Sequence, residues 1–171
     1  MTALPDANEA MNRLSPEDYR QILQETHLDL IALDALDARV DRRAWLQGEG
    51  QVEADLKREW SVVRDRPDAA ALVATWVLRA SIAGKVGARV KATYRLALSS
   101  RSPVELSDDF LAIYASLSGD RQIWPYLREL TSSVGSKLGV PAPTLPMLVD
   151  HQEIGGGAPR SASKKAAKLG P

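Results

Sequence analysis

The run Leu72-Val-Ala-Thr-Trp-Val-Leu-Arg-Ala-Ser-Ile82 places an apolar residue at every second position, and Thr75, Arg79 and Ser81 fall between these positions. A period of two is that of a β-strand with one buried face. Residues 52–62 and 88–98 repeat the pattern. The connections between the three runs are short and contain turn-forming residues, so consecutive strands must be antiparallel. The sequence predicts an antiparallel sheet with one apolar face and one charged face.

The stretch before these strands is ambiguous. Residues 26–40 alternate through Leu28, Leu30 and Ala32 and then change phase at Leu33. This pattern fits a long strand with a bulge, or an amphipathic helix that carries leucines on one side. Periodicity alone does not separate the two structures.

Helix signals occur on both sides of the strands. Ser15 followed by Pro16 is typical of a helix start, with serine as the N-cap and proline at the first helical position. After the strands, both Ser102-Pro103 and Ser107-Asp108-Asp109 are candidate helix starts.

A longer helix is predicted to begin around Pro125, because the residue before a proline is biased away from helical geometry. Its apolar stripe has helical spacing and comprises Ile123, Leu127, Leu130, Val134 and Leu138. Gly139 and Pro141 should end it. The proline-rich residues 140–146 are predicted to be an extended cover over the core.

The two ends of the chain differ in composition from the middle. We predict a flexible N-terminus at residues 1–14, a folded domain at 15–150 and a disordered tail at 151–171. The tail is locally basic, and its cations are Arg160, Lys164, Lys165 and Lys168. A solubilising role is the simplest interpretation of such a tail.

Composition excludes several classes of function. The chain has 171 residues, with 22 basic and 22 acidic side chains, and a balanced charge argues against nucleic acid as a partner. It has no cysteine and two histidines that are far apart, His27 and His151. No metal site, cofactor or catalytic triad is therefore expected. Gly84-Lys-Val-Gly87 lacks the features of a phosphate loop. With no export signal and no membrane insertion expected, we predict a cytoplasmic protein.

Two other features allow more than one interpretation. Tryptophan occurs at 45, 60, 76 and 124 in a chain with one phenylalanine, which suits either a core or an adaptable apolar surface. The predicted helix carries small residues at Ser132, Gly135, Ser136 and Gly139. These would let two helices approach closely, or they form an exposed polar face.

The segment Ile123-Trp-Pro-Tyr-Leu-Arg-Glu-Leu130, followed by Leu138-Gly-Val-Pro-Ala-Pro-Thr-Leu-Pro146, resembles the SecB family of export chaperones and SecB-like chaperones. The specific part of the match is Trp124, Pro125, Tyr126, Arg128 and Glu129.

The resemblance implies an α+β fold, in which a long helix packs on one face of a four-stranded antiparallel sheet. It makes residues 26–40 the first strand and residues 44–50 a crossover loop. It also implies a dimer of dimers without enzymatic activity, which holds unfolded polypeptides in apolar grooves. In export, such chaperones hand clients to the SecA motor, and some SecB-like members protect an antitoxin.

Two departures from the export chaperones concern SecA. The chain has Gly-Gly-Gly and lysines where those proteins have a C-terminal helix and an acidic tail, and it lacks their overall acidity. The resemblance therefore implies client holding more directly than handover to SecA.

These observations predict a molecular chaperone for unfolded or pre-secretory clients. The expected client contacts are apolar residues of the sheet and crossover loop: Trp45, Leu46, Trp60, Leu72, Trp76, Leu78 and Tyr94. The residues expected to pack or to mediate assembly are Leu127, Leu130, Ser132, Gly135 and Ser136.

Two alternatives remain at this point. One is a chaperone dedicated to a single client such as an antitoxin. The other is a small ligand-binding or enzymatic domain, in which Arg58 anchors a pocket between sheet and helix. Arg58 interrupts an otherwise apolar strand face, although a charge there also suits an edge strand that avoids aggregation.

Overall fold

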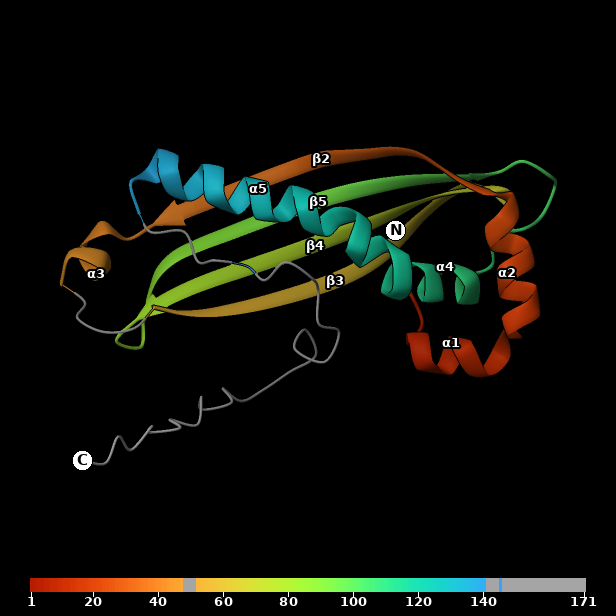
Figure 1. Cartoon of the computed structure of the whole chain (residues 1–171), viewed down its shortest axis with the longest axis horizontal. Coiled ribbons are helices and arrows are strands. Elements are labelled where there is room, and N and C mark those ends of the chain that lie inside the picture. Colours follow the sequence, from red (N-terminus) through yellow and green to blue (C-terminus); the bar gives the residue numbers. More distant parts are fainter. Residues whose placement is uncertain (48–51, 141–144, 146–171) are drawn as a thin grey trace, which may run out of the picture.

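The computed structural model describes residues 1–47, 52–140 and 145. One long helix lies along a twisted antiparallel sheet, and shorter helices gather at the sheet's two ends (Figure 1). The elements, in chain order, are β1 (Thr2–Ala3), α1 (Ala7–Arg13), α2 (Pro16–Glu25), β2 (Thr26–Val40), α3 (Arg42–Gln47), β3 (Val52–Arg66), β4 (Ala69–Ile82), β5 (Lys85–Ser100), α4 (Asp108–Tyr114), the π-helical turn η1 (Ala115–Gly119) and α5 (Asp120–Leu138). The predicted tail at 151–171 lies outside the described residues.

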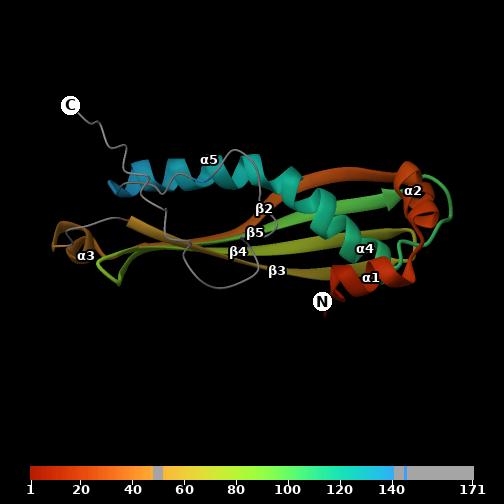
Figure 2. The ribbon, with the colours of Figure 1, turned by 60° about the horizontal axis from the view of Figure 1, so that its bottom comes forward.

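The sheet has the strand order β1-β3-β4-β5-β2, and every neighbouring pair is antiparallel. Its four long strands confirm the three strands predicted from alternation and the first strand, β2, that the resemblance implied. A fifth strand was not expected, and it is a two-residue β1 that pairs with Ser61 and Val62 of β3. Figure 2 shows α5 and α4 on the same face of this sheet.

Residues 26–40 form a strand, which resolves the ambiguity of their pattern. The register of β2 against β5 shifts between Leu28 and Leu30, and again between Leu33 and Ala35. The second shift coincides with the phase change in the sequence. Because each shift adds an unpaired residue, it turns the following side chains to the other face of the sheet.

The first 14 residues differ from the flexible segment that we predicted. Asp6 caps α1 by accepting hydrogen bonds from the backbone N–H groups of Asn8 and Glu9. Ala10 is fully buried against α4. A short polar helix is stable when it packs against a larger structure, and the local sequence pattern does not show this packing.

The predicted start of α2 is confirmed, because the Ser15 hydroxyl accepts a hydrogen bond from the Asp18 backbone N–H at 3.1 Å. Ser107 caps α4 in the same way, whereas Ser102-Pro103 is outside any helix. The crossover region is partly helical rather than a loop, since α3 occupies the first part of it.

The long helix begins at Asp120, five residues before the predicted start at Pro125. A proline inside a helix removes one backbone hydrogen bond. Burial of Ile123, Trp124 and Leu127 on the inner side offsets this loss. The predicted end is confirmed, because Gly139 adopts a left-handed conformation with φ of 67°.

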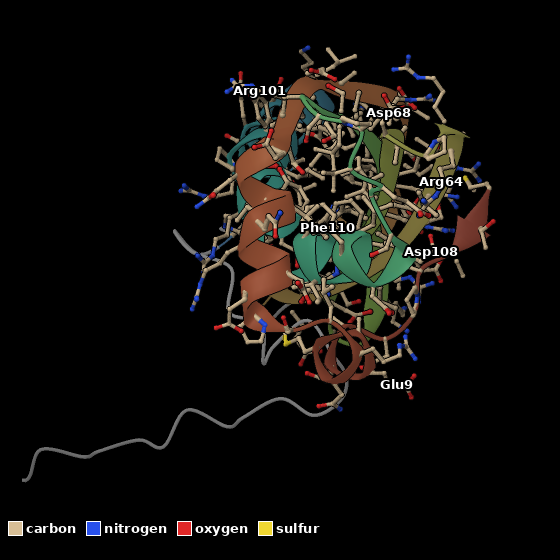
Figure 3. The ribbon with its side chains drawn as sticks, turned by 90° about the vertical axis from the view of Figure 1, so that its right-hand side faces the viewer. Glu9, Arg64, Asp68, Arg101, Asp108 and Phe110 are labelled. Carbon is tan, nitrogen blue, oxygen red and sulfur yellow. The ribbon has the colours of Figure 1, made fainter. Side chains whose placement is uncertain are left out.

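The core lies between α5, α4 and the alternating apolar residues of β4 and β5. Leu145 also joins this core, which agrees with the predicted cover, although residues 141–144 and 146 lie outside the described part of the chain. At the end where α1, α2 and α4 meet, Phe110 is fully buried and Arg64 of β3 forms an ion pair with Asp108 (Figure 3).

Candidate functional site

A small apolar groove, with a cavity volume of about 20 Å³, lies between the second half of α5 and the sheet. Its sheet side is formed by Val40, Leu78, Ala80, Ala88 and Val90, and its helix side by Thr131, Val134, Gly135, Leu138 and Val140. Thr131 is the one residue of this set with a polar side chain, and its hydroxyl donates to the Leu127 carbonyl at 2.8 Å. The lining of the groove is therefore apolar in practice.

Apolar surface continues from the groove along β2. Leu33, Leu36 and Val40 pair with Tyr94, Ala92 and Ala88 of β5. Those β5 residues alternate along one strand, so their partners all lie on the face that α5 covers. Leu33 is 43% exposed and Leu36 is 44% exposed, because β2 is the last strand of the sheet. We call this set, from Leu33 to the groove, the apolar strip.

The apolar strip is suited to binding rather than to catalysis. Burial of apolar side chains is non-directional and stabilises a complex by roughly 25 cal/mol per Å². Among the strands of the described residues, β2 is also the last in the sheet, and an extended peptide can add to such an edge as a further strand. Together these features can hold extended apolar segments of many sequences.

A buried polar cluster lies where α5 begins. Asp120 has no exposed surface, and its carboxylate forms an ion pair with Arg58 of β3. The indole N–H of Trp60 donates to the same carboxylate at 3.2 Å. Burial lowers the pKa of the Arg58 guanidinium. Arg58 is not part of the groove lining, and its partner is a residue of the core.

The predicted client contacts have different positions. Leu78 lines the groove. Leu72, Trp76 and Tyr94 lie beneath the helices and are at most 3% exposed, so in this structure they are core residues. Trp60 is half-buried and bonded to Asp120.

The two predicted contacts in α3 lie at the end of the sheet. The Trp45 ring covers Gly87 so closely that a β-carbon there would lie 2.7 Å from its Nε1 atom. The backbone of Leu46 belongs to α3, and its side chain lies outside the described part of the structure.

The predicted assembly residues do not share one face of α5. Leu127 is buried, Leu130 packs against the core and Gly135 lines the groove. Ser132 and Ser136 are exposed on the outer side of the helix. The small residues therefore do not form a single contact stripe.

The five residues of α5 that carry the resemblance to the SecB family also differ in burial. Trp124 is buried with its ring centre 5.8 Å from that of Trp76. Pro125, Tyr126 and Glu129 are exposed, and Arg128 is half-buried.

Tyr94 gives the folded chain a specific dependence on alkaline pH. Burial, with a contribution from the Glu129 carboxylate, raises the pKa of Tyr94 to about 12. In the unfolded chain the phenol has a pKa of about 10. Between these values the unfolded state releases a proton that the folded state keeps. The free energy of unfolding should therefore fall as the pH rises from 10 to 12.

Urea unfolding at several pH values tests this expectation. Tyr94→Phe should weaken the loss of stability above pH 10, and Tyr126→Phe, at an exposed position on α5, should leave it unchanged. Equal pH profiles for wild type and Tyr94→Phe would contradict the assignment.

Sequence reasoning missed most of the apolar strip. Val134 and Leu138 were predicted only as part of a packed stripe, and Ala80 and Ala88 as ordinary strand residues. The phase change at Leu33 was a signal for a bulged strand, but it did not show that this strand lies at the edge of the sheet.

Two kinds of site are absent from the described residues. Residues 1–47, 52–140 and 145 contain no group of three or more histidine, aspartate or glutamate side chains placed to hold a metal ion. Within the same ranges, no helix combines the length and the apolar character needed to cross a bilayer.

No protein-family model matches the sequence, and no curated protein matches it. Among solved structures, it is similar to the SecB-like chaperone Rv1957 of Mycobacterium tuberculosis, which was solved in complex with a ChAD peptide from the HigA1 antitoxin Rv1956. The two have a TM-score of 0.65 and 19% sequence identity, over 77% of this chain and 96% of that chain. A protein of unknown function from Streptococcus agalactiae gives a TM-score of 0.34 at 12% identity, over 72% of this chain and 98% of that one. The similarity to Rv1957 shows that this chain has a SecB-like fold.

Proposed function

We propose that this protein is a SecB-like holdase that binds unfolded polypeptide segments along the apolar strip. The observation that carries the proposal is the exposed Leu33 and Leu36 beside an apolar groove, on the free edge of the sheet. A structural neighbour, Rv1957, is a chaperone that was solved with a peptide bound. The protein acts by binding and not by catalysis.

The clients that we propose are unfolded or pre-secretory polypeptides, or a single dedicated client of the antitoxin type. The protein works in the cytoplasm as a homotetramer, so that one client occupies several grooves and gains avidity. SecA is the proposed acceptor if the clients are exported.

The alternative of an enzymatic or ligand-binding domain places Arg58 in a pocket between sheet and helix, and the contacts of Arg58 favour it less than the holdase. The guanidinium of Arg58 pairs with Asp120, and the groove lining is formed by other residues.

Leu36→Asp should weaken the binding of an unfolded client by about tenfold or more, because burial of a leucine contributes roughly 1.5–3 kcal/mol. The matched control is Ala35→Asp, which places the same charge on the opposite face of the same strand, where Ala35 pairs with Thr93. The measurement is the titration of a chemically unfolded, fluorescently labelled client, together with the suppression of its aggregation.

Equal weakening by both variants would show that charge on β2, and not the apolar strip, determines binding. Unchanged binding by Leu36→Asp would overturn the assignment of the site.

A further inference from the structure

The face of the sheet opposite α5 carries a row of three arginines. In the β-sheet register, Arg79 of β4 lies directly opposite Arg89 of β5, and Arg89 lies opposite Arg39 of β2. All three side chains are exposed. Arg79 lies between the buried Leu78 and Ala80, so the arginines point away from the core. We call these three residues the arginine row.

The next row on the same face is also basic. Lys57 and Lys91 are both opposite Val77 of β4, one on each side. The acids within these two rows are Asp55, opposite Arg79, and Asp37, opposite Lys91. The two rows together thus contain five cations and two carboxylates, although the net charge of the chain is zero.

This arrangement carries a cost that the ion pairs among the described residues offset only at Arg39. Like charges directly opposite one another on neighbouring strands are destabilising. Arg39 forms an ion pair with Asp37 at 3.2 Å. Within the described ranges, Arg79, Arg89 and Lys91 form no ion pair. Arg89 is therefore flanked by two like charges, and a bound anion would relieve the repulsion.

We propose that the arginine row binds an acidic, extended segment of a partner protein. Neighbouring strands lie about 4.8 Å apart, so a segment that crosses them can place carboxylates between successive guanidinium groups. Arginine binds carboxylate through two parallel hydrogen bonds. Asp37, Asp55 and Glu53 lie around the row on the same face. A peptide can space its carboxylates so that they meet the arginines and avoid these acids, whereas a phosphate backbone carries a charge at every nucleotide, and this difference favours a peptide over a nucleic acid.

This second surface is separate from the apolar strip, because the two lie on opposite faces of the sheet. An unfolded client and an acidic partner should therefore bind at the same time. The proposal does not rest on the holdase activity.

Fluorescence anisotropy of a short labelled peptide that alternates aspartate and serine tests the proposal. The full chain should bind it at low salt and lose affinity as salt is raised, because exposed charges are screened. The double variant Arg79→Gln/Arg89→Gln should weaken binding by about tenfold or more, the loss that follows from removing two charge-assisted contacts.

The matched control is Arg20→Gln/Arg66→Gln, which makes the same change in net charge at two exposed arginines outside the row. It should bind the peptide as wild type does. A thermal melt separates binding from folding, since loss of repulsion should leave the midpoint of Arg79→Gln/Arg89→Gln unchanged or raise it.

Three results would overturn the proposal. The first is equal affinity of the peptide for both double variants, and the second is no binding at low salt. The third is tighter binding of a single-stranded oligothymidylate with the same dependence on Arg79 and Arg89, which would make the partner a nucleic acid. An unfolded client that displaces the peptide would contradict the separation of the two surfaces.

Discussion

Asp120→Ala should lower the free energy of unfolding by about 3–5 kcal/mol. The carboxylate is fully buried, pairs with Arg58 and accepts the Trp60 indole N–H. Removing one partner of a buried ion pair leaves the other charge without compensation in the protein interior. Urea unfolding followed by tryptophan fluorescence measures the change.

Asp109→Ala is the matched control, since Asp109 pairs with an exposed Arg13 at 2.6 Å. It should cost about 1 kcal/mol or less, as surface ion pairs do. A double replacement, Arg58→Met with Asp120→Leu, should be less destabilised than Asp120→Ala, because neither charge then remains. A small effect of Asp120→Ala would contradict the structural role of the pair.

Trp76→Ala should also cost about 3–5 kcal/mol, the range for removing a large aromatic residue from a core. The Trp76 side chain is 1% exposed, and its ring packs against that of Trp124. Denaturant unfolding measures this loss, and client titration under conditions where the variant is folded measures binding.

The two possible roles of Trp76, as a core residue and as a client contact, predict opposite results for Trp76→Ala. As a core residue, its loss lowers stability and leaves the affinity of the folded protein for a client close to wild type. If Trp76→Ala unfolds at the same urea concentration as wild type and loses client binding, Trp76 is a client contact after all.

The sheet could be predicted from the sequence because alternation along β4 and β5 is a local property. Leu72 and Trp76 lie at alternate positions of β4, and the period of two shows that they share a face. It does not show what covers the face. The structure places α5 and α4 over it, so these residues are buried in the core, and their contact with clients stays a prediction.

Other features depended on contacts between distant segments. Ala10 stabilises α1 by packing on α4, and the helix α5 continues through Pro125 because its inner side is buried. The role of Asp120 could not be predicted from the sequence, since its partner Arg58 is far away along the chain. The arginine row required the register of three strands, which alternation alone does not supply.

The apolar strip also depends on contacts that local sequence patterns do not show. β2 is an edge strand, and the exposed Leu33 and Leu36 could be recognised only once its neighbours were known. The phase change in residues 26–40 was visible, yet it was compatible with helix or strand.

Size-exclusion chromatography coupled to light scattering, with and without a chemically unfolded client, is the most direct test of the holdase proposal. The account predicts a tetramer that co-elutes with the unfolded client and ignores the same protein when it is folded. A compact monomer that does not bind the unfolded client would contradict it.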